Sequence, residues 1–147
     1  MHFHHEGYSG YFFIRSRQNG KVLDVEGGSS DAGVRICIWP KKDYDNDNQL
    51  WKFEEGFLVN KRSGLVIDIQ SGELAPDRNI CQYDRKWVQE ANNQRWGYED
   101  GFIYCRARPD LVLDIRGGDD SDGTEVIVYN KKYEDNYNQK WEVEKAE

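Results

Sequence analysis

The sequence predicts an all-β domain that consists of three copies of one short unit. Two residue patterns recur in the same order, and turn-forming residues separate short runs of β-branched and aromatic residues. The first pattern is Asn-Gln-x-Trp, with successive copies 45 residues apart, at Asn48–Trp51, Asn93–Trp96 and Asn138–Trp141. The second is an aspartate between two aliphatic residues, at Leu23–Val25, Ile67–Ile69 and Leu113–Ile115. No stretch keeps a helical period, so the copies are expected to share one β-sheet core.

Each copy opens with a glycine followed by an aromatic residue, and this pair marks the boundaries of the units. We expect one domain over residues 10–143, divided into a first repeat (10–55), a second repeat (56–100) and a third repeat (101–143). Residues 1–9 and 144–147 are expected to be tails, and the first tail holds the only histidines, His2, His4 and His5. A single unit cannot bury its own apolar face, so the repeats are expected to close into a ring without free sheet edges.

The composition excludes several classes of function. The 147 residues include 20 Lys and Arg against 27 Asp and Glu, a net charge of −7. Nucleic acids and anionic membranes attract basic surfaces instead. The longest apolar run, Tyr11–Ile14, is far shorter than the ~20 residues that cross a bilayer. We therefore expect no nucleic-acid partner and no membrane insertion.

The cysteines and the first residues indicate the compartment. Cys37, Cys81 and Cys105 are an odd number without a Cys-x-x-Cys pair, which argues against a disulfide framework or a zinc site. The first ten residues lack the basic start and apolar stretch of a signal peptide. We expect free thiols, no metal and no organic cofactor. The expected location is cytoplasmic, or secreted by a route that needs no signal peptide.

Side-chain alternation along the predicted strands brings polar and aromatic residues together. Successive side chains point to opposite faces of a strand, so Leu23 and Val25 face the core and Asp24 faces outward. By the same alternation Trp39, fifteen residues later, lies on an outer face where core packing does not explain it. The same spacing links Asp68 to Tyr83 and Asp114 to Tyr129. A carboxylate beside an aromatic ring suits a sugar, which presents hydroxyls and an apolar C–H face.

The Gln-x-Trp repeats, with Leu-Asp-Val and Ile-x-Ile-Trp-Pro upstream, resemble the ricin B-chain type of β-trefoil lectin from about Tyr11 to Val143. The resemblance implies a six-stranded barrel capped by three hairpins around a pseudo-three-fold axis. It also implies shallow pockets for galactose-type sugars, up to one per repeat. The implied partners are glycoproteins or glycolipids whose glycans end in galactose or N-acetylgalactosamine. The implied carbohydrate-binding residues are Asp24, Trp39 and Asn48; Asp68, Tyr83 and Asn93; and Asp114, Tyr129 and Asn138.

Each of these residue types has a chemical reason to contact a sugar. Galactose, with its axial 4-hydroxyl, leaves one face continuously apolar and able to stack on Trp or Tyr. A carboxylate accepts hydrogen bonds from two adjacent hydroxyls, and such charge-assisted bonds are about twice as strong as neutral ones. The Asn amide adds a donor and an acceptor. The Gln and Trp of each repeat are expected to brace the core instead, and the Asp residues could also serve only to brace a turn.

The second site is expected to be the weakest. Ten residues separate Tyr83 from Asn93, against nine in the other repeats, so the insertion is expected to displace Asn93 from the pocket. Cys37 stands where the family often has Gln, which removes one polar contact from the first site. Basic pairs in the equivalent loops are expected to be solvated turns, at Lys41-Lys42, Arg85-Lys86 and Lys131-Lys132.

Two other functions compete with the lectin interpretation. One is the ribosome-inactivating rRNA N-glycosidase activity of ricin-like toxins, for which Glu90-Ala91 and Arg95 loosely echo a Glu-Ala-Ala-Arg motif. In ricin-type toxins that chemistry belongs to a separate chain of unrelated fold. The other is a protein-interaction trefoil whose sugar pockets are vestigial. Glycoside hydrolysis needs two differently tuned carboxylates in one pocket, whereas one Asp recurs per repeat, so no enzyme is expected.

Overall fold

The computed structural model describes residues 10–146, and the predicted tail over residues 1–9, with its histidines, lies outside the described part. Twelve strands lie within residues 10–146: β1 (Phe12–Ser16), β2 (Val22–Val25), β3 (Ile36–Trp39), β4 (Trp51–Glu54), β5 (Phe57–Asn60), β6 (Val66–Ile69), β7 (Arg78–Tyr83), β8 (Trp96–Glu99), β9 (Phe102–Cys105), β10 (Arg108–Ile115), β11 (Val126–Asn130) and β12 (Trp141–Lys145). Six short 3₁₀ turns join them: η2 (Glu26–Gly28), η3 (Asp47–Gln49), η4 (Gln70–Gly72), η5 (Val88–Glu90), η6 (Arg116–Gly118) and η7 (Tyr137–Gln139). No helix among these residues is long and apolar enough to cross a membrane.

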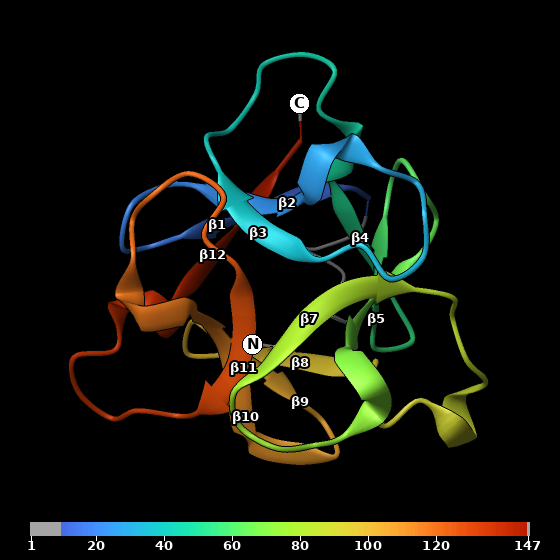
Figure 1. Cartoon of the computed structure of the whole chain (residues 1–147), viewed down its shortest axis with the longest axis vertical. Helices are drawn as coiled ribbons and strands as arrows, with labels where there is room; N and C mark the ends of the chain where they lie inside the picture. The colour runs from blue at the N-terminus through green and yellow to red at the C-terminus, as the bar shows by residue number, and fades with distance from the viewer. Residues whose placement is uncertain (1–9, 147) are drawn as a thin grey trace.

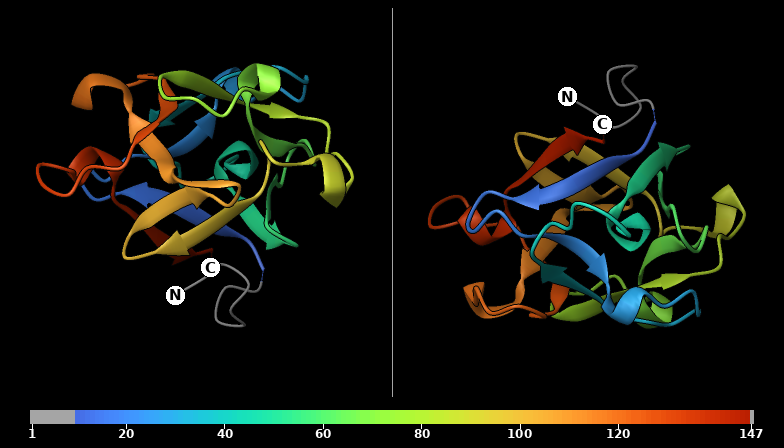
Figure 2. Two further views of the ribbon diagram at one scale, coloured as in Figure 1. Left: turned by 90° about the horizontal axis from the view of Figure 1, so that it is seen from below. Right: turned by 90° about the horizontal axis from the view of Figure 1, so that it is seen from above.

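The strands divide into a barrel and a set of caps. Strands β1, β4, β5, β8, β9 and β12 form the barrel, in which β1 pairs with both β12 and β4. The other six strands form three antiparallel hairpins, β2–β3, β6–β7 and β10–β11. Viewed down the axis, β3, β7 and β11 surround the centre of the molecule, one from each repeat (Figure 1). Side views show the hairpins at one end and the barrel strands at the other (Figure 2).

The core forms where the repeated apolar residues converge. The three Gln-x-Trp tryptophans, Trp51, Trp96 and Trp141, are fully buried in one cluster with the aliphatic residues that flank each pocket aspartate. Their indole Nε1 atoms donate to the carbonyls of Leu23 (3.3 Å), Ile67 (3.1 Å) and Leu113 (3.2 Å). Burying so large a side chain while its one donor is satisfied stabilises the domain without an unpaired polar group. The structural role expected for these tryptophans is confirmed.

The hairpin loops close the ring of repeats. The backbone amide of Gly33 in the first repeat donates to the carbonyl of Gln82 in the second. Asp77 in the second repeat donates in the same way to Val128, and Gly123 in the third donates to Ile38. These three loop residues have φ of 88°, 66° and 87°, a left-handed conformation that glycine adopts most readily. Each hairpin is therefore anchored on the next one around the axis.

The C-terminal boundary differs from the prediction. Strand β12 runs to Lys145, which lies opposite Phe12, and the backbone amide of Ala146 donates to the Tyr11 carbonyl. Residues 144–146 are therefore part of the barrel and not a tail. The polar Glu-Val-Glu-Lys sequence conceals this, because its carboxylates face outward, where Glu144 pairs with Arg15 and Glu142 with Arg17.

Candidate functional site

Three equivalent pockets lie between the caps and the Gln-x-Trp segments. In each, an Asp comes from the first strand of the hairpin, an aromatic residue from the second strand, and an Asn from the turn before the next barrel strand, which is a 3₁₀ segment in the first and third repeats. The first pocket (Asp24, Trp39, Asn48) has a volume of about 220 Å³. The second pocket (Asp68, Tyr83, Asn93) has about 400 Å³, and the third (Asp114, Tyr129, Asn138) about 550 Å³. The structure thus brings together all nine residues selected from the sequence, three to a pocket.

Each carboxylate is more enclosed than alternation along the strand indicates. The side chains of Asp24, Asp68 and Asp114 line their pockets, yet these residues are only 5%, 4% and 4% exposed. The Gln of each Gln-x-Trp donates through Nε2 to the aspartate Oδ2, at 2.9 Å, 2.8 Å and 2.9 Å for Gln49, Gln94 and Gln139. The expected direction away from the core is therefore right, but the carboxylates are buried within the pockets. Each forms the floor of a pocket, and in the second pocket Oδ1 also accepts a weak hydrogen bond from Cys81 Sγ at 3.8 Å.

Burial and hydrogen bonding act in opposite directions on the pKa of these acids. Burial raises the pKa of Asp24, Asp68 and Asp114 above the ordinary aspartate value, while the glutamine hydrogen bond and the nearby lysine act in the opposite direction. The glutamine therefore has two functions. It anchors the 3₁₀ segment through a backbone carbonyl, as Gln49 does at Pro40 (3.0 Å), and it holds the carboxylate oriented.

The lysine in second position of each basic pair, expected to lie in a solvated turn, lines the pocket of its repeat. Lys42 Nζ donates to Asn48 Oδ1 at 3.0 Å, while Asn48 Nδ2 donates to the Val25 carbonyl at 3.1 Å. The equivalent lysine–asparagine bonds are 2.9 Å for Lys86–Asn93 and 2.8 Å for Lys132–Asn138. The first basic residue of each pair is also engaged, because it lies over a barrel aromatic: Lys41 over Phe13, Arg85 over Phe57, and Lys131 over Phe102. The expectation that these pairs are only solvated turns is wrong, and their recurrence in all three repeats is the one feature of the sequence that distinguishes them from ordinary surface lysines.

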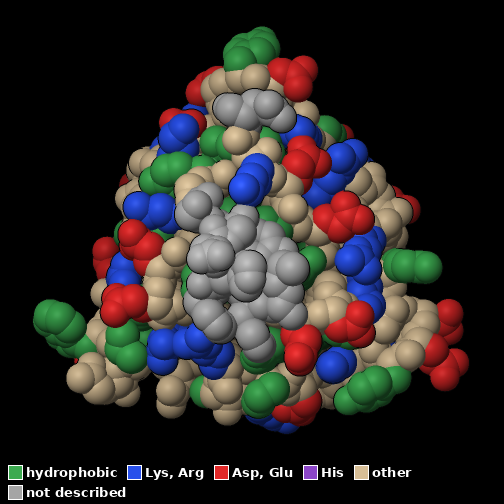
Figure 3. Space-filling view, turned by 180° about the vertical axis from the view of Figure 1, so that it is seen from behind, with side chains coloured by type: hydrophobic (Ala, Val, Ile, Leu, Met, Phe, Trp, Pro, Cys, Tyr) green, Lys and Arg blue, Asp and Glu red, His purple; other side chains and the backbone are tan. Residues whose placement is uncertain are grey.

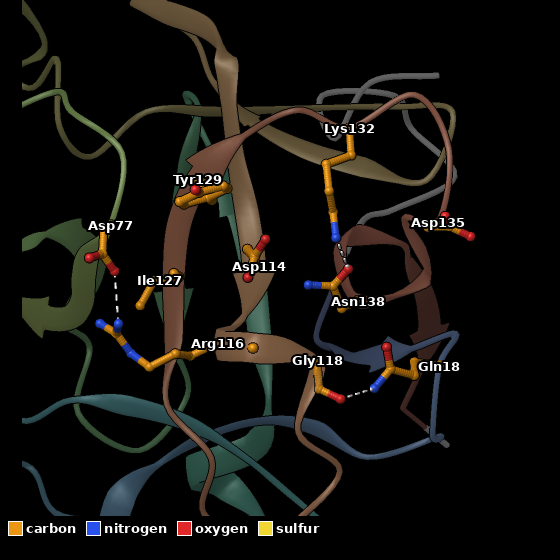
Figure 4. A pocket seen from close by; sticks show the side chains of 11 residues that line it. Gln18, Asp77, Asp114, Arg116, Gly118, Ile127, Tyr129, Lys132, Asp135 and Asn138 are labelled. Carbon is orange, nitrogen blue, oxygen red and sulfur yellow. Dashed lines mark hydrogen bonds and ion pairs between the residues drawn. The ribbon is translucent and has the colours of Figure 1, made fainter.

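The aromatic side chains form a half-exposed wall of each pocket. Trp39, Tyr83 and Tyr129 are 42%, 44% and 41% exposed, although the residue before each of them in its strand is buried. A half-exposed ring beside a buried carboxylate presents both an apolar platform and a hydrogen-bond acceptor. Figure 4 shows this arrangement in the third pocket, where Asp114 lies between Tyr129 and Asn138.

The insertion in the second repeat does not displace Asn93. Its Nδ2 donates to the Ile69 carbonyl at 3.0 Å, as Asn48 and Asn138 do in their own repeats. The predicted displacement is therefore wrong, because the extra residue is accommodated in the turn η5, before Asn93. Gln82, which occupies an inward position, is also fully satisfied: it donates to the carbonyls of Ser29 and Asp31 and accepts from Ser63.

The pockets differ in residues around the shared set. Cys37, Cys81 and Ile127 occupy one equivalent position, and Glu26, Gln70 and Arg116 another. In the third pocket Arg116 is held by Asp77 (2.8 Å) and Asn79 (2.9 Å). The neighbouring repeats also contribute walls, since Gly123 lines the first pocket, Gly33 the second and Asp77 the third.

The three thiols are free, as expected from the sequence, and all three are buried. Burial raises the pKa of Cys37 and Cys81 to about 12 and also raises that of Cys105. We therefore expect iodoacetamide to label the native chain slowly at pH 8 and to add three labels after denaturation, because the thiolate is the reactive form. Mass spectrometry of both samples checks this. A disulfide between any two of these cysteines in the native chain would contradict the structure.

The residues that echo an N-glycosidase motif do not share a pocket. Glu90 lies in η5 and lines a shallow concavity with Arg85, Lys86 and Trp87. Ala91 is fully buried against the barrel, and Arg95 Nε donates to the Glu55 carbonyl at 2.9 Å. Arg95 is not among the residues that line the concavity beside Glu90.

Comparison with known proteins agrees with the pattern of repeats and pockets. The family model described as ricin-type beta-trefoil lectin domain matches residues 10–141. Mucoricin from Rhizopus delemar is 49% identical over 99 residues, which are 67% of this chain and 67% of mucoricin.

Solved structures give the same fold. The designed three-fold symmetric protein ThreeFoil superimposes with a TM-score of 0.80 at 28% identity, over 94% of this chain and 100% of its own. The C-terminal half of an earthworm R-type lectin, solved in complex with GalNAc, has a TM-score of 0.75 at 28% identity, over 91% and 97% of the two chains. The β-trefoil predicted from the sequence repeats is confirmed.

Proposed function

Because this chain belongs to the ricin-type β-trefoil lectin family, with a carbohydrate-binding type of fold, we propose that it binds glycans ending in galactose or N-acetylgalactosamine. The proposed binding residues are the Asp, the aromatic residue and the Asn of each pocket, with Lys42, Lys86 and Lys132 beside them. The proposed role is recognition without catalysis.

One observation carries this proposal: the same four side chains, with the same hydrogen bonds, recur in three pockets. Structural bracing alone explains the buried Gln–Asp bond, but it does not explain a half-exposed aromatic ring beside it in every copy. The ring supplies a platform for the apolar face of galactose. The aspartate Oδ1 and the lysine ammonium supply an acceptor and a donor for hydroxyls at its edge.

The geometry also favours binding over the N-glycosidase alternative. Each pocket contains one aspartate already fixed by a glutamine, and repetition of one site is the arrangement of a multivalent binder. Glu90 and Arg95, which only loosely echo the toxin motif, have different contacts: Glu90 lines the concavity beside Trp87, and Arg95 donates to the Glu55 carbonyl. A depurination assay on ribosomes tests this directly, and release of adenine by the purified chain would contradict the proposal.

We expect each pocket to bind methyl β-galactoside weakly, with Kd from high micromolar to millimolar. Shallow pockets with a few hydrogen bonds and one stacked ring support about −4 to −6 kcal/mol. Isothermal titration with methyl β-galactoside and with N-acetylgalactosamine measures this, and methyl α-mannoside is the control sugar. EDTA should leave the affinity unchanged, because the glutamine and lysine side chains already hold the aspartate and the asparagine in place. No heat with either sugar, together with a blank glycan array, would contradict the proposal.

A further inference from the structure

The insertion of one residue in the second repeat changes the shape of the loop beside its pocket. In the first and third repeats this loop is closed by an asparagine, since Asn46 Nδ2 donates to the Lys42 carbonyl (3.0 Å) and Asn136 Nδ2 to the Lys132 carbonyl (2.9 Å). In the second repeat the turn η5 replaces this arrangement, with the Glu90 amide donating to the Trp87 carbonyl at 2.9 Å. The extra residue therefore forms a new turn that begins at a tryptophan.

Both ends of this turn are fixed. At its start the Lys86 amide donates to Gln94 Oε1 at 2.9 Å. At its end Ala91 is fully buried in a cluster with Phe57, Val59 and Val66. A segment anchored at both ends loses little further conformational freedom when a ligand binds it.

Trp87 lies on this anchored turn with 79% of its surface exposed. Hydrophobic side chains project at the corners of the triangular outline of the molecule (Figure 3). Exposing an indole this far is unfavourable in water, and large exposed apolar groups often mark binding surfaces.

A concavity of about 480 Å³ adjoins Trp87 and is lined by Arg85, Lys86, Trp87 and Glu90. Lys86 also lines the second pocket, where its Nζ contacts Asn93. The two hollows therefore adjoin at Lys86.

The chemistry of this concavity matches that of the pockets themselves. Trp87 offers an aromatic platform, and the exposed Glu90 carboxylate can accept hydrogen bonds from two adjacent hydroxyls. Arg85 is already engaged by Glu54 (2.9 Å) and Glu55 (2.7 Å). Because Arg85 is compensated, and Lys86 and Glu90 add one charge of each sign, the concavity has no excess positive charge and suits a neutral sugar better than an acidic one.

We propose that the Trp87 concavity is a subsite for the sugar next to the terminal one, so that the second pocket recognises a neutral oligosaccharide of two or more residues. This proposal rests on the proposed function. It also gives the extra residue of the second repeat a role, which the proposed function alone does not.

The test uses the full chain with Asp24→Asn and Asp114→Asn, which leaves the second pocket intact. Isothermal titration compares methyl β-galactoside with lactose and N-acetyllactosamine, with and without Trp87→Ala. We expect Trp87→Ala to weaken binding of one or both disaccharides about tenfold and to leave methyl β-galactoside unchanged. Tyr133→Ala is the matched control, because Tyr133 is 84% exposed on the equivalent loop of the third repeat. It should change neither affinity.

The NMR signal of the Trp87 indole N–H gives a second measurement, assigned by its loss in Trp87→Ala. It should shift on titration with the disaccharide and stay in place with methyl β-galactoside. Two outcomes would overturn the subsite while the proposed function stands. Trp87→Ala could weaken binding of methyl β-galactoside and of the disaccharides equally, or it could leave disaccharide binding unchanged. Absence of any galactoside binding by the unmodified chain would overturn the proposed function, and the subsite with it.

Discussion

Replacing the three pocket aspartates together, as Asp24→Asn, Asp68→Asn and Asp114→Asn, is expected to lower binding to a surface dense in galactosides by about 10²–10⁴. Single sites are weak, so retention on such a surface depends on several pockets acting at once. Each single variant should reduce this binding much less. Asp68→Asn should reduce it about as much as either Asp24→Asn or Asp114→Asn does, because all three aspartates accept the same hydrogen bond from a glutamine. Surface-plasmon resonance on a galactosylated chip measures all four variants.

The same triple variant should fold at least as stably as the parent at pH 7. Burial raises the folded-state pKa of these carboxyls above their ordinary value of 3.8. Between 3.8 and the raised value, the folded chain holds protons that the unfolded chain has released, so stability falls as pH rises through this window. At pH 7, above the unfolded value of 3.8, this cost of burying the charges lowers the stability of the parent, and asparagine, which does not ionise, avoids it. The gain in Tm should disappear below pH 3.8.

A control of equal charge change separates the pockets from net charge. Asp43, Asp84 and Glu134 are exposed residues of the loops beside the three pockets. Changing them to Asn, Asn and Gln should leave binding to the chip intact. Full retention of binding by the pocket triple variant would place recognition elsewhere on the molecule.

The largest effect on stability is expected from Trp96→Ala, at about 3–5 kcal/mol. Trp96 is fully buried, and its indole donates to the Ile67 carbonyl, so the substitution leaves both a cavity and an unpaired acceptor. Urea unfolding followed by circular dichroism measures the free energy of unfolding. Trp87→Ala, which removes the same side chain from an exposed position, should stay within about 0.5 kcal/mol of the parent. A loss below about 1 kcal/mol for Trp96→Ala would contradict the burial of this residue.

The fold could be predicted almost entirely from the sequence, because three copies in register leave few alternatives. Trp51 and Leu23 recur at the spacing that a shared core requires, and the structure buries both. The nine pocket residues could be selected as well, since the recurrence of Asp, aromatic and Asn does not depend on knowing how the loops fold.

The surroundings of those residues could not be predicted, for reasons that lie in the loops. Alternation along β2 correctly turns Asp24 away from the core, but it gives no information on the 3₁₀ segment that covers it and carries Gln49. Lys42 could not be distinguished from a solvated lysine because its partner Asn48 approaches only when that segment folds. The insertion near Asn93 seemed disruptive because counting residues treats a loop as rigid, whereas a loop pinned at Lys86 and Ala91 absorbs one more residue as a turn.

Each pocket is lined by residues of more than one repeat, and this limits how a chain of three repeats can arise from a single one. Gly123 of the third repeat lines the first pocket, and Arg62 of the second repeat braces its rim through the Gly28 carbonyl at 3.2 Å. One repeat alone would therefore carry an aspartate, an aromatic residue and an asparagine, but no complete pocket. Three identical short chains assembled as a homotrimer would complete all three pockets at once. Fusion of three gene copies would then free each pocket to change by itself, as the equivalent positions now held by Glu26, Gln70 and Arg116 show.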